Sequence, residues 1–196
     1  MNKREFLLAS SKLMLLGGAS LVMPGSMSFA RTKSSDLFFE ISLAQWSLHR
    51  SLQKGDLNNL DFAQTAQEQF GISAVEYVNQ FFMDKAQDAT YLAEMKDRSD
   101  DNGVKNLLIM VDDEGDLGLL AEKKRRQSVE NHYKWIEASH SLGCNSIRIN
   151  AFGDGSKEEV KQAMIESLGM LTDFSAPENI NVLIENHGNY SSDAAW

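Results

Sequence analysis

A glutamate at the end of a short apolar run is the clearest candidate for chemistry in this sequence. Glu185 follows the apolar residues 182–184, and His187 lies two residues further on. Residues i and i+2 of a strand face the same side, so the two side chains converge if the strand continues. A carboxylate there can bind a hard divalent cation or act as a base. It can also be a strand-end group paired with a neighbouring charge, and spacing alone leaves both interpretations open.

Other polar residues sit at comparable positions. Glu76 lies among apolar residues within 74–78, where an unpaired charge is costly, so it is either a site residue or half of a structural ion pair. His49 follows the first apolar run and is either a substrate contact or a hydrated loop residue. The acidic residues 112–116 lack the spacing of an EF-hand and indicate a loop after a strand. His132 and His140 lie on a helical pattern, which predicts packing or surface roles.

The elements that must position these residues alternate between strand and helix. Helical spacing joins Leu60 to Phe70, and a capping box opens a later helix at Ser156. Two more helical patterns end before Gly103 and Gly143. Strands separated by helices imply parallel pairing through right-handed crossovers. The strands are expected at 38–44, 73–78, 106–111, 146–150 and 181–185.

The position of the polar residues favours one α/β architecture over another. A doubly wound nucleotide-binding sheet usually carries a G-x-G-x-x-G turn after its first strand, and this sequence has Gln45-Trp46-Ser47-Leu48-His49 there. In a (β/α)8 TIM barrel, by contrast, polar residues follow several different strands. Here Arg148 and Asn150 end the fourth run, and Glu185 ends the fifth. The pattern therefore predicts a TIM barrel.

Charge and the first thirty residues bound the partners and the compartment. The formal net charge of −9 has the wrong sign for a nucleic-acid partner, and a single cysteine forms no internal disulfide. Residues 1–30 have a basic start, an apolar run at 13–23 and a small-residue end at Ala30, the order of an export signal. The run is too short for a stable membrane anchor. We expect cleavage after Ala30 and a periplasmic or secreted protein, exported by a twin-arginine-like or the general secretory route.

Three segments give the chain a specific resemblance. Residues 75–82, 142–151 and 182–188 resemble the sugar phosphate isomerase/epimerase family, which has the xylose isomerase-like TIM barrel. The resemblance implies one divalent metal ion (Mn, Mg or Zn) held by side chains from four strands. Of those ligands Glu185 maps onto this sequence, both as ligand and as catalytic acid/base, and the other three would lie beyond Trp196. The resemblance also suggests substrate-binding roles, for His49, Glu76, Arg148 and His187.

The chemistry that the resemblance implies is proton transfer next to a carbonyl, through an enediolate. Phosphorylated sugars are mainly cytoplasmic, so an exported protein is expected to take a free sugar or keto sugar. One alternative is a lyase or hydrolase that acts on 3-keto-glycosides outside the cytoplasm. Another is a non-catalytic carbohydrate-binding barrel. Product analysis separates the first alternative from an epimerase, and metal-independent sugar binding without turnover would indicate the second.

The length of the chain adds a further expectation. A TIM barrel has eight strands in typically ~250 residues, and 31–196 accommodates five βα units. We therefore expect 31–196 to be a partial barrel domain that binds metal weakly, lacks catalysis and exposes apolar surface. Residues 191–196 are expected to open a fifth helix, with a Ser or Asp as its N-cap. The alternative is a complete five-stranded open sheet.

Overall fold

The computed structural model describes residues 39–196, so the predicted export signal lies outside the described residues. Within them the chain forms five strands in a single sheet. Four agree with the predicted runs to within a residue or two. The first is shorter than expected, because the buried side chain of Gln45 turns the chain and accepts a hydrogen bond from the Val78 amide (2.8 Å). The strands are β1 (Leu43–Ala44), β2 (Ala74–Val78), β3 (Lys105–Val111), β4 (Ser146–Asn150) and β5 (Asn181–Glu185).

Helices connect successive strands, as the alternating pattern predicts. The expected helix over 60–70 is divided into a 3-10 turn (Asn59–Asp61), α3 and a π-helical turn (Ala66–Phe70), and Gly71 ends it in the left-handed region (φ 68°). Shorter 3-10 turns occupy Gln45–Leu48, Asn79–Phe81, Met83–Lys85 and Ala176–Glu178. The α-helices are α2 (His49–Lys54), α3 (Phe62–Thr65), α4 (Ala89–Asp101), α5 (Glu122–Ser141) and α6 (Lys157–Ser175).

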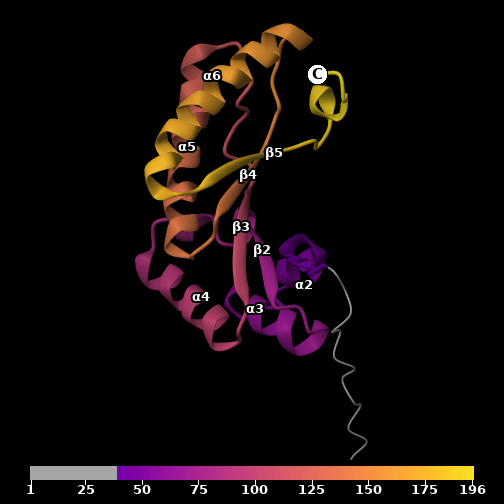
Figure 1. Cartoon of the computed structure of the whole chain (residues 1–196), viewed down its shortest axis with the longest axis vertical. Coiled ribbons are helices and arrows are strands. Elements are labelled where there is room, and N and C mark those ends of the chain that lie inside the picture. Colours follow the sequence, from indigo (N-terminus) through magenta and orange to yellow (C-terminus); the bar gives the residue numbers. More distant parts are fainter. Residues whose placement is uncertain (1–38) are drawn as a thin grey trace, which may run out of the picture. The chain divides into compact units, whose positions relative to one another are not determined.

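The sheet is parallel throughout, and its strand order β1-β2-β3-β4-β5 follows the sequence. Helices α4, α5 and α6 pack on the same face of this sheet, as Figure 1 shows. Sequential parallel strands with helices on one face are the arrangement of a (β/α)8 barrel. The five strands are thus consistent with part of such a barrel, and the sheet face away from the helices corresponds to the barrel interior.

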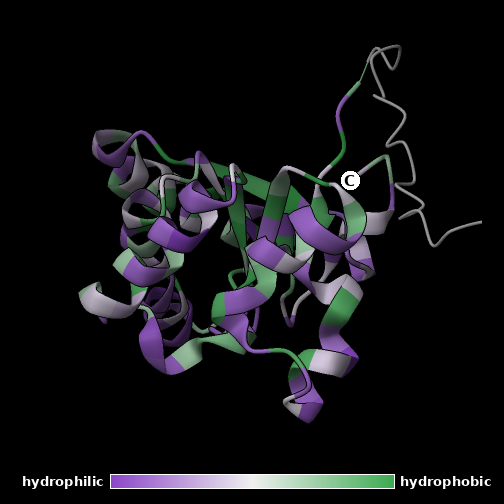
Figure 2. Ribbon diagram, turned by 90° about the horizontal axis from the view of Figure 1, so that it is seen from below, coloured by the Kyte–Doolittle hydropathy of each residue, from purple (hydrophilic) through white to green (hydrophobic). Residues whose placement is uncertain are grey.

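Alternation along the strands divides the residues between the two faces. Ile147 and Ile149 of β4 are fully buried in the core under the helices, together with Ile109 of β3 and Trp135 and Ile136 of α5. Figure 2 shows the result, with largely hydrophobic strands beside helices that mix hydrophobic and hydrophilic residues. Because successive strand residues point to opposite faces, the polar residues between these isoleucines must face the barrel interior.

Helix α5 differs from the sequence expectation in which face it buries. Val129, Tyr133, Ile136 and His140 have the spacing of one helix face, but His140 is exposed, whereas His132 is buried with Trp135. The basic stretch at its start is not wholly solvated either. Arg125 is buried, donates to the Leu119 carbonyl oxygen (2.8 Å) and pairs with Glu166 (2.5 Å). Val129 and Ile136 are buried as their spacing predicts, and the buried face also includes His132 and Trp135.

The start of α6 confirms one prediction, and the segment after β5 corrects another. Helix α6 begins with the predicted capping box between Ser156 and Glu159. The expected opening of a helix over 191–196 is instead a 3-10 turn, Asn189–Ser192, followed by a non-helical end. Asp193 makes the contact of an N-cap, accepting from the Ala195 amide (3.0 Å). The Trp196 indole donates to the Lys157 carbonyl (3.1 Å), which ties this segment to the start of α6.

Strand β5 has solvent on both of its faces. Leu183 and Ile184, which point to opposite sides of the sheet, are 43% and 51% exposed.

No helix between residues 39 and 196 is long and apolar enough to cross a membrane.

Candidate functional site

A cavity of about 860 Å³ lies at the carboxyl ends of the strands, on the barrel-interior side of the sheet. Its wall holds residues from all five strands or the loops that follow them. The wall is rich in carboxylates, which are Asp112, Asp113, Glu114, Asp116 and Glu185. Arg148 is the positively charged side chain among the lining residues, and His132 and His187 complete the titratable groups. This is the end of the sheet at which TIM barrels place their active sites.

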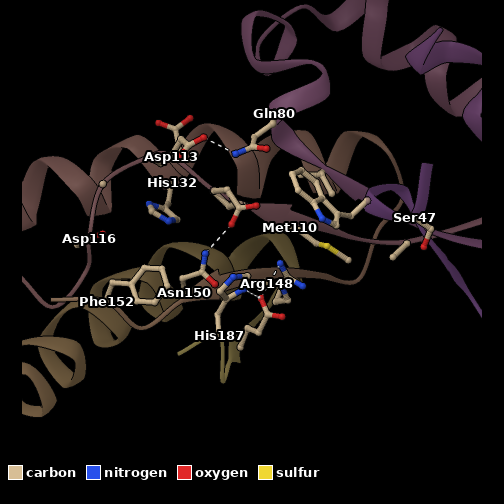
Figure 3. A pocket seen from close by; sticks show the side chains of 18 residues that line it. Ser47, Gln80, Met110, Asp113, Asp116, His132, Arg148, Asn150, Phe152 and His187 are labelled. Carbon is tan, nitrogen blue, oxygen red and sulfur yellow. Dashed lines mark hydrogen bonds and ion pairs between the residues drawn. The ribbon is translucent and has the colours of Figure 1, made fainter. Parts of the chain in front are cut away.

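The strand register explains why these side chains meet. Asn150 of β4 pairs with Glu185 of β5, and Arg148 pairs with Leu183. Since Ile147 and Ile149 face the helices, Arg148 and Asn150 face the cavity. Figure 3 shows Arg148, Asn150 and His187 gathered on one side of the cavity. The site is therefore a consequence of parallel pairing between strands far apart in sequence.

Glu185 is held by two neighbours. Its Oε2 forms an ion pair with Arg148 Nη2 (2.9 Å) and lies 2.9 Å from His187 Nδ1. A carboxylate only accepts, so His187 Nδ1 carries a proton in this contact. The His187 ring also meets Phe152 edge to face, with centroids 6.0 Å apart. These contacts engage Oε2 and leave Oε1 available to a ligand.

The β3 and β4 side of the cavity is a second hydrogen-bonded group. Asn150 Nδ2 donates to Asp112 Oδ1 (2.7 Å), and Gln80 Nε2 donates to Asp113 Oδ2 (2.5 Å), as drawn in Figure 3. Asn79 fixes the backbone of Asp112, donating to its carbonyl and accepting from its amide (2.8 and 2.9 Å). Two buried atoms beside this group, Asn150 Oδ1 and Arg148 Nε, have no partner among residues 39–196.

Sequence reasoning did not place His132 in this wall, and it gave Glu114 only as an acidic residue of the loop after a strand. His132 is 3% exposed, and its Nδ1 lies 2.7 Å from the Ser128 carbonyl oxygen. Burial lowers the pKa of His132, which favours the neutral ring. Glu114 is buried and accepts from the Trp135 indole (2.6 Å) while it pairs with Lys134 (2.7 Å). The spacing of His132 and Trp135, three residues apart on one helix, is the signal that could have revealed this face.

The metal ion implied by the resemblance fits this site in part. A carboxylate oxygen with no other partner, such as Glu185 Oε1, suits a hard divalent cation. Across residues 39–196, however, no three His, Cys, Asp or Glu side chains gather closely enough to hold a metal ion. The described residues thus supply one candidate ligand and do not by themselves form a metal site.

The remaining predicted site residues lie away from the cavity lining. His49 stacks on Trp46 (centroids 4.8 Å apart), and its Nδ1 lies 2.7 Å from the Trp46 carbonyl. It touches the site through Trp46, which does line the cavity. Glu76 faces the barrel interior from β2 and accepts from Ser42 Oγ (2.5 Å) in place of the expected ion pair. The structure thus brings Glu185, Arg148 and His187 together and leaves His49 and Glu76 outside.

A parallel βα sheet with its polar cavity at the carboxyl ends of the strands defines a (β/α)-barrel protein. Residues 64–195 match the model of the Xylose isomerase-like TIM barrel family. The chain belongs to that family. No curated protein matches the sequence.

Several solved structures have the same fold. The chain is similar to 3-keto-D-glucoside 4-epimerase YcjR from E. coli (16% identity, TM-score 0.54, 65% of this chain and 50% of that one). It is also similar to D-psicose 3-epimerase crystallised with D-fructose (14%, TM-score 0.57, 78% and 54%). A third is the IolI protein with a bound zinc atom (14%, TM-score 0.55, 74% and 51%). The chain spans about half the length of each.

Proposed function

We propose that the chain is the site-bearing part of a sugar isomerase or epimerase that moves a proton next to a carbonyl group. The observation that carries this proposal is the Glu185 carboxylate, which lies at a strand end inside the cavity with one oxygen held by Arg148 and His187. A positioned carboxylate can take a proton from the carbon beside a carbonyl and return it to a neighbouring position. The substrate keeps all its atoms, so no further reactant is needed.

The charge of the cavity supports an unphosphorylated substrate. Five carboxylates line it, and Arg148 is already paired with Glu185. A phosphate group would lose its hydration and meet mainly negative charge, whereas sugar hydroxyls can donate to carboxylates. A free sugar or keto sugar is therefore the proposed substrate, in agreement with the predicted export of the protein to the periplasm or beyond.

The metal ion remains a prediction, with Mn, Mg or Zn as candidates and Glu185 as one ligand. The similarity to IolI, whose structure holds a zinc atom, supports it. A lyase or hydrolase of 3-keto-glycosides is a second candidate, supported by the similarity to a 3-keto-D-glucoside 4-epimerase. Elimination from a keto-glycoside begins with the same proton removal, so the two functions share Glu185 and differ in their products.

The test is exchange of the substrate proton in D₂O. The complete gene product with added Mn²⁺ would be incubated with D-fructose, D-fructose 6-phosphate and a 3-keto-glucoside, and deuterium at carbons beside the carbonyl would be followed by NMR. We expect incorporation into an unphosphorylated sugar, and a loss of about 100-fold or more in Glu185→Gln. Glu137→Gln, an exposed glutamate on α5, is the matched control.

Release of the aglycone from the 3-keto-glucoside would favour the lyase or hydrolase. Exchange that persists in Glu185→Gln, or that occurs with phosphorylated sugars alone, would contradict the proposal.

A further inference from the structure

The His132 side chain reaches the cavity from a helix, unlike the other polar residues of the wall, which come from strand ends and their loops. It lies on the inner face of α5, is 3% exposed, and lines the cavity. Figure 3 shows the ring between the helix and the cavity, on the same side as Asp113 and Asp116. A buried histidine ring has lost water on both nitrogens, so each nitrogen needs a partner.

The contact with Ser128 fixes which nitrogen carries the proton. Nδ1 lies 2.7 Å from the Ser128 carbonyl oxygen, and a carbonyl oxygen only accepts, so Nδ1–H is the donor. In the neutral ring Nε2 is then a bare acceptor. No partner for Nε2 lies among residues 39–196. The neutral form is favoured because burial lowers the pKa of His132.

The groups around His132 offer few protons. Glu114 raises its pKa and Lys134 lowers it, but these two are paired with each other. Asp112, Asp113 and Asp116 complete this part of the wall with further acceptors.

We propose that His132 Nε2 is a hydroxyl-binding point in the cavity wall that selects polyhydroxylated, uncharged ligands. Nε2 accepts a hydrogen bond from a ligand hydroxyl, and His132 acts as a specificity-determining residue. The inference rests on the proposed function and adds to it the group that recognises hydroxyls away from Glu185. A site built to accept from a hydroxyl rejects analogues without it, because its own acceptors are then left buried and unpaired.

The test uses the full chain and D-fructose as the probe. ¹⁵N NMR of the histidine rings distinguishes a protonated nitrogen from a bare one. We expect His132 to show a protonated Nδ1 and a bare Nε2, and the Nε2 signal to move as D-fructose is added. His132→Phe keeps a ring but removes the acceptor, and should weaken D-fructose binding by about five- to tenfold.

Two further variants separate this role from a structural one. The Gln side chain places an oxygen near the position of Nε2, so His132→Gln should bind D-fructose within about twofold of the wild type. His140→Phe, on an exposed position of the same helix, should bind as the wild type does.

The outcomes also distinguish the hydroxyl-binding point from the proposed function. If other signals of the chain move with D-fructose while the His132 nitrogens stay unchanged, the hydroxyl-binding point is refuted and sugar binding stands. Equal weakening in the Phe and Gln variants would likewise refute it. If no signal of the chain moves at high D-fructose concentration, both the hydroxyl-binding point and the proposed sugar function are overturned.

Discussion

The two sides of the cavity are held in place in different ways. On the β3 and β4 side, backbone atoms join the two loops, with the Gly118 amide donating to the Phe152 carbonyl (2.7 Å). Ser167 of α6 donates to the Leu117 carbonyl (2.6 Å), and Asp154 accepts from the Leu120 amide (2.8 Å). On the β5 side, Glu185 is oriented by the side chains of Arg148 and His187, on a strand with both faces partly exposed.

This difference suits the β3 and β4 side to ligand recognition and the β5 side to the proposed proton transfer. Acceptors that stand on backbone-anchored loops and a buried helix keep one geometry, which suits a hydroxyl-binding wall. The carboxylate of Glu185 is held by the side chains of Arg148 and His187, which are 21% and 54% exposed. We therefore expect its position to respond to whatever binds beside it. Four perturbations, from the largest expected effect to the smallest, test whether the anchored side is the more rigid one.

The largest effect is expected where the two loops touch. A Cβ on Gly153 would lie 2.3 Å from the Gly118 carbonyl oxygen, so Gly153→Ala must force the loops apart. We expect a loss of about 2 kcal/mol or more in the free energy of unfolding, measured by urea denaturation. Gly169→Ala in α6 is the control, because nothing lies within 4 Å of its Cβ and alanine favours the helix. A Gly153→Ala variant as stable as the wild type would mean that the loop contact is not a constraint.

The next effect concerns the buried carboxylate beneath the same loop. Glu114→Ala leaves the Trp135 indole N–H buried without its partner and also unpairs Lys134. We expect a loss of about 1–3 kcal/mol in the free energy of unfolding. Asp116→Ala, an exposed acid two residues away, should change it by less than about 0.5 kcal/mol. Equal effects of the two substitutions would contradict a structural role for Glu114.

A smaller effect is expected on the β5 side. Arg148→Met removes the ion pair with Glu185, whose side chain is 26% exposed and keeps its contact with His187. We expect a loss of at most about 1 kcal/mol, also measured by urea denaturation. A loss that exceeds the Gly153→Ala effect would reverse the comparison between the two sides.

The smallest effect is a pH dependence from His132. Burial lowers the pKa of this ring below its ordinary value of 6.5, with Glu114 opposing the shift and Lys134 adding to it. Between the native pKa and 6.5 the unfolded chain therefore binds the proton and the native chain does not. Stability from this source is lost as pH falls through 6.5 towards the native value. Unfolding free energies measured at one pH above 6.5 and at one pH below it should thus differ more for the wild type than for His132→Gln.

The position of Glu185 shows how far local pattern reaches. An apolar run that ends in a carboxylate predicts a strand and a strand-end acid, and both β5 and the cavity position of Glu185 agree with it. Arg148 and Asn150 likewise end the fourth predicted run, and both line the cavity. These inferences succeed because strand periodicity and parallel order are properties of the chain itself.

His132 and His49 show where the sequence stops being informative. A histidine on a helical stripe looks the same whether the stripe is centred on Tyr133 or on Trp135, and only packing of the Trp135 ring against the sheet decides which. His49 was expected as a contact, but stacking on Trp46 holds it beside the cavity.

The sequence by itself thus determined the alternating elements, the parallel sheet, the capping box and the carboxylate at the end of β5. Each depends on residue types within one element or on the order of elements along the chain. Only the tertiary structure decided that Arg148 reaches Glu185, that Asn150 reaches Asp112, and that His132 lines the cavity. Those contacts join residues whose mutual distance is set by strand register and helix packing, which no local pattern encodes.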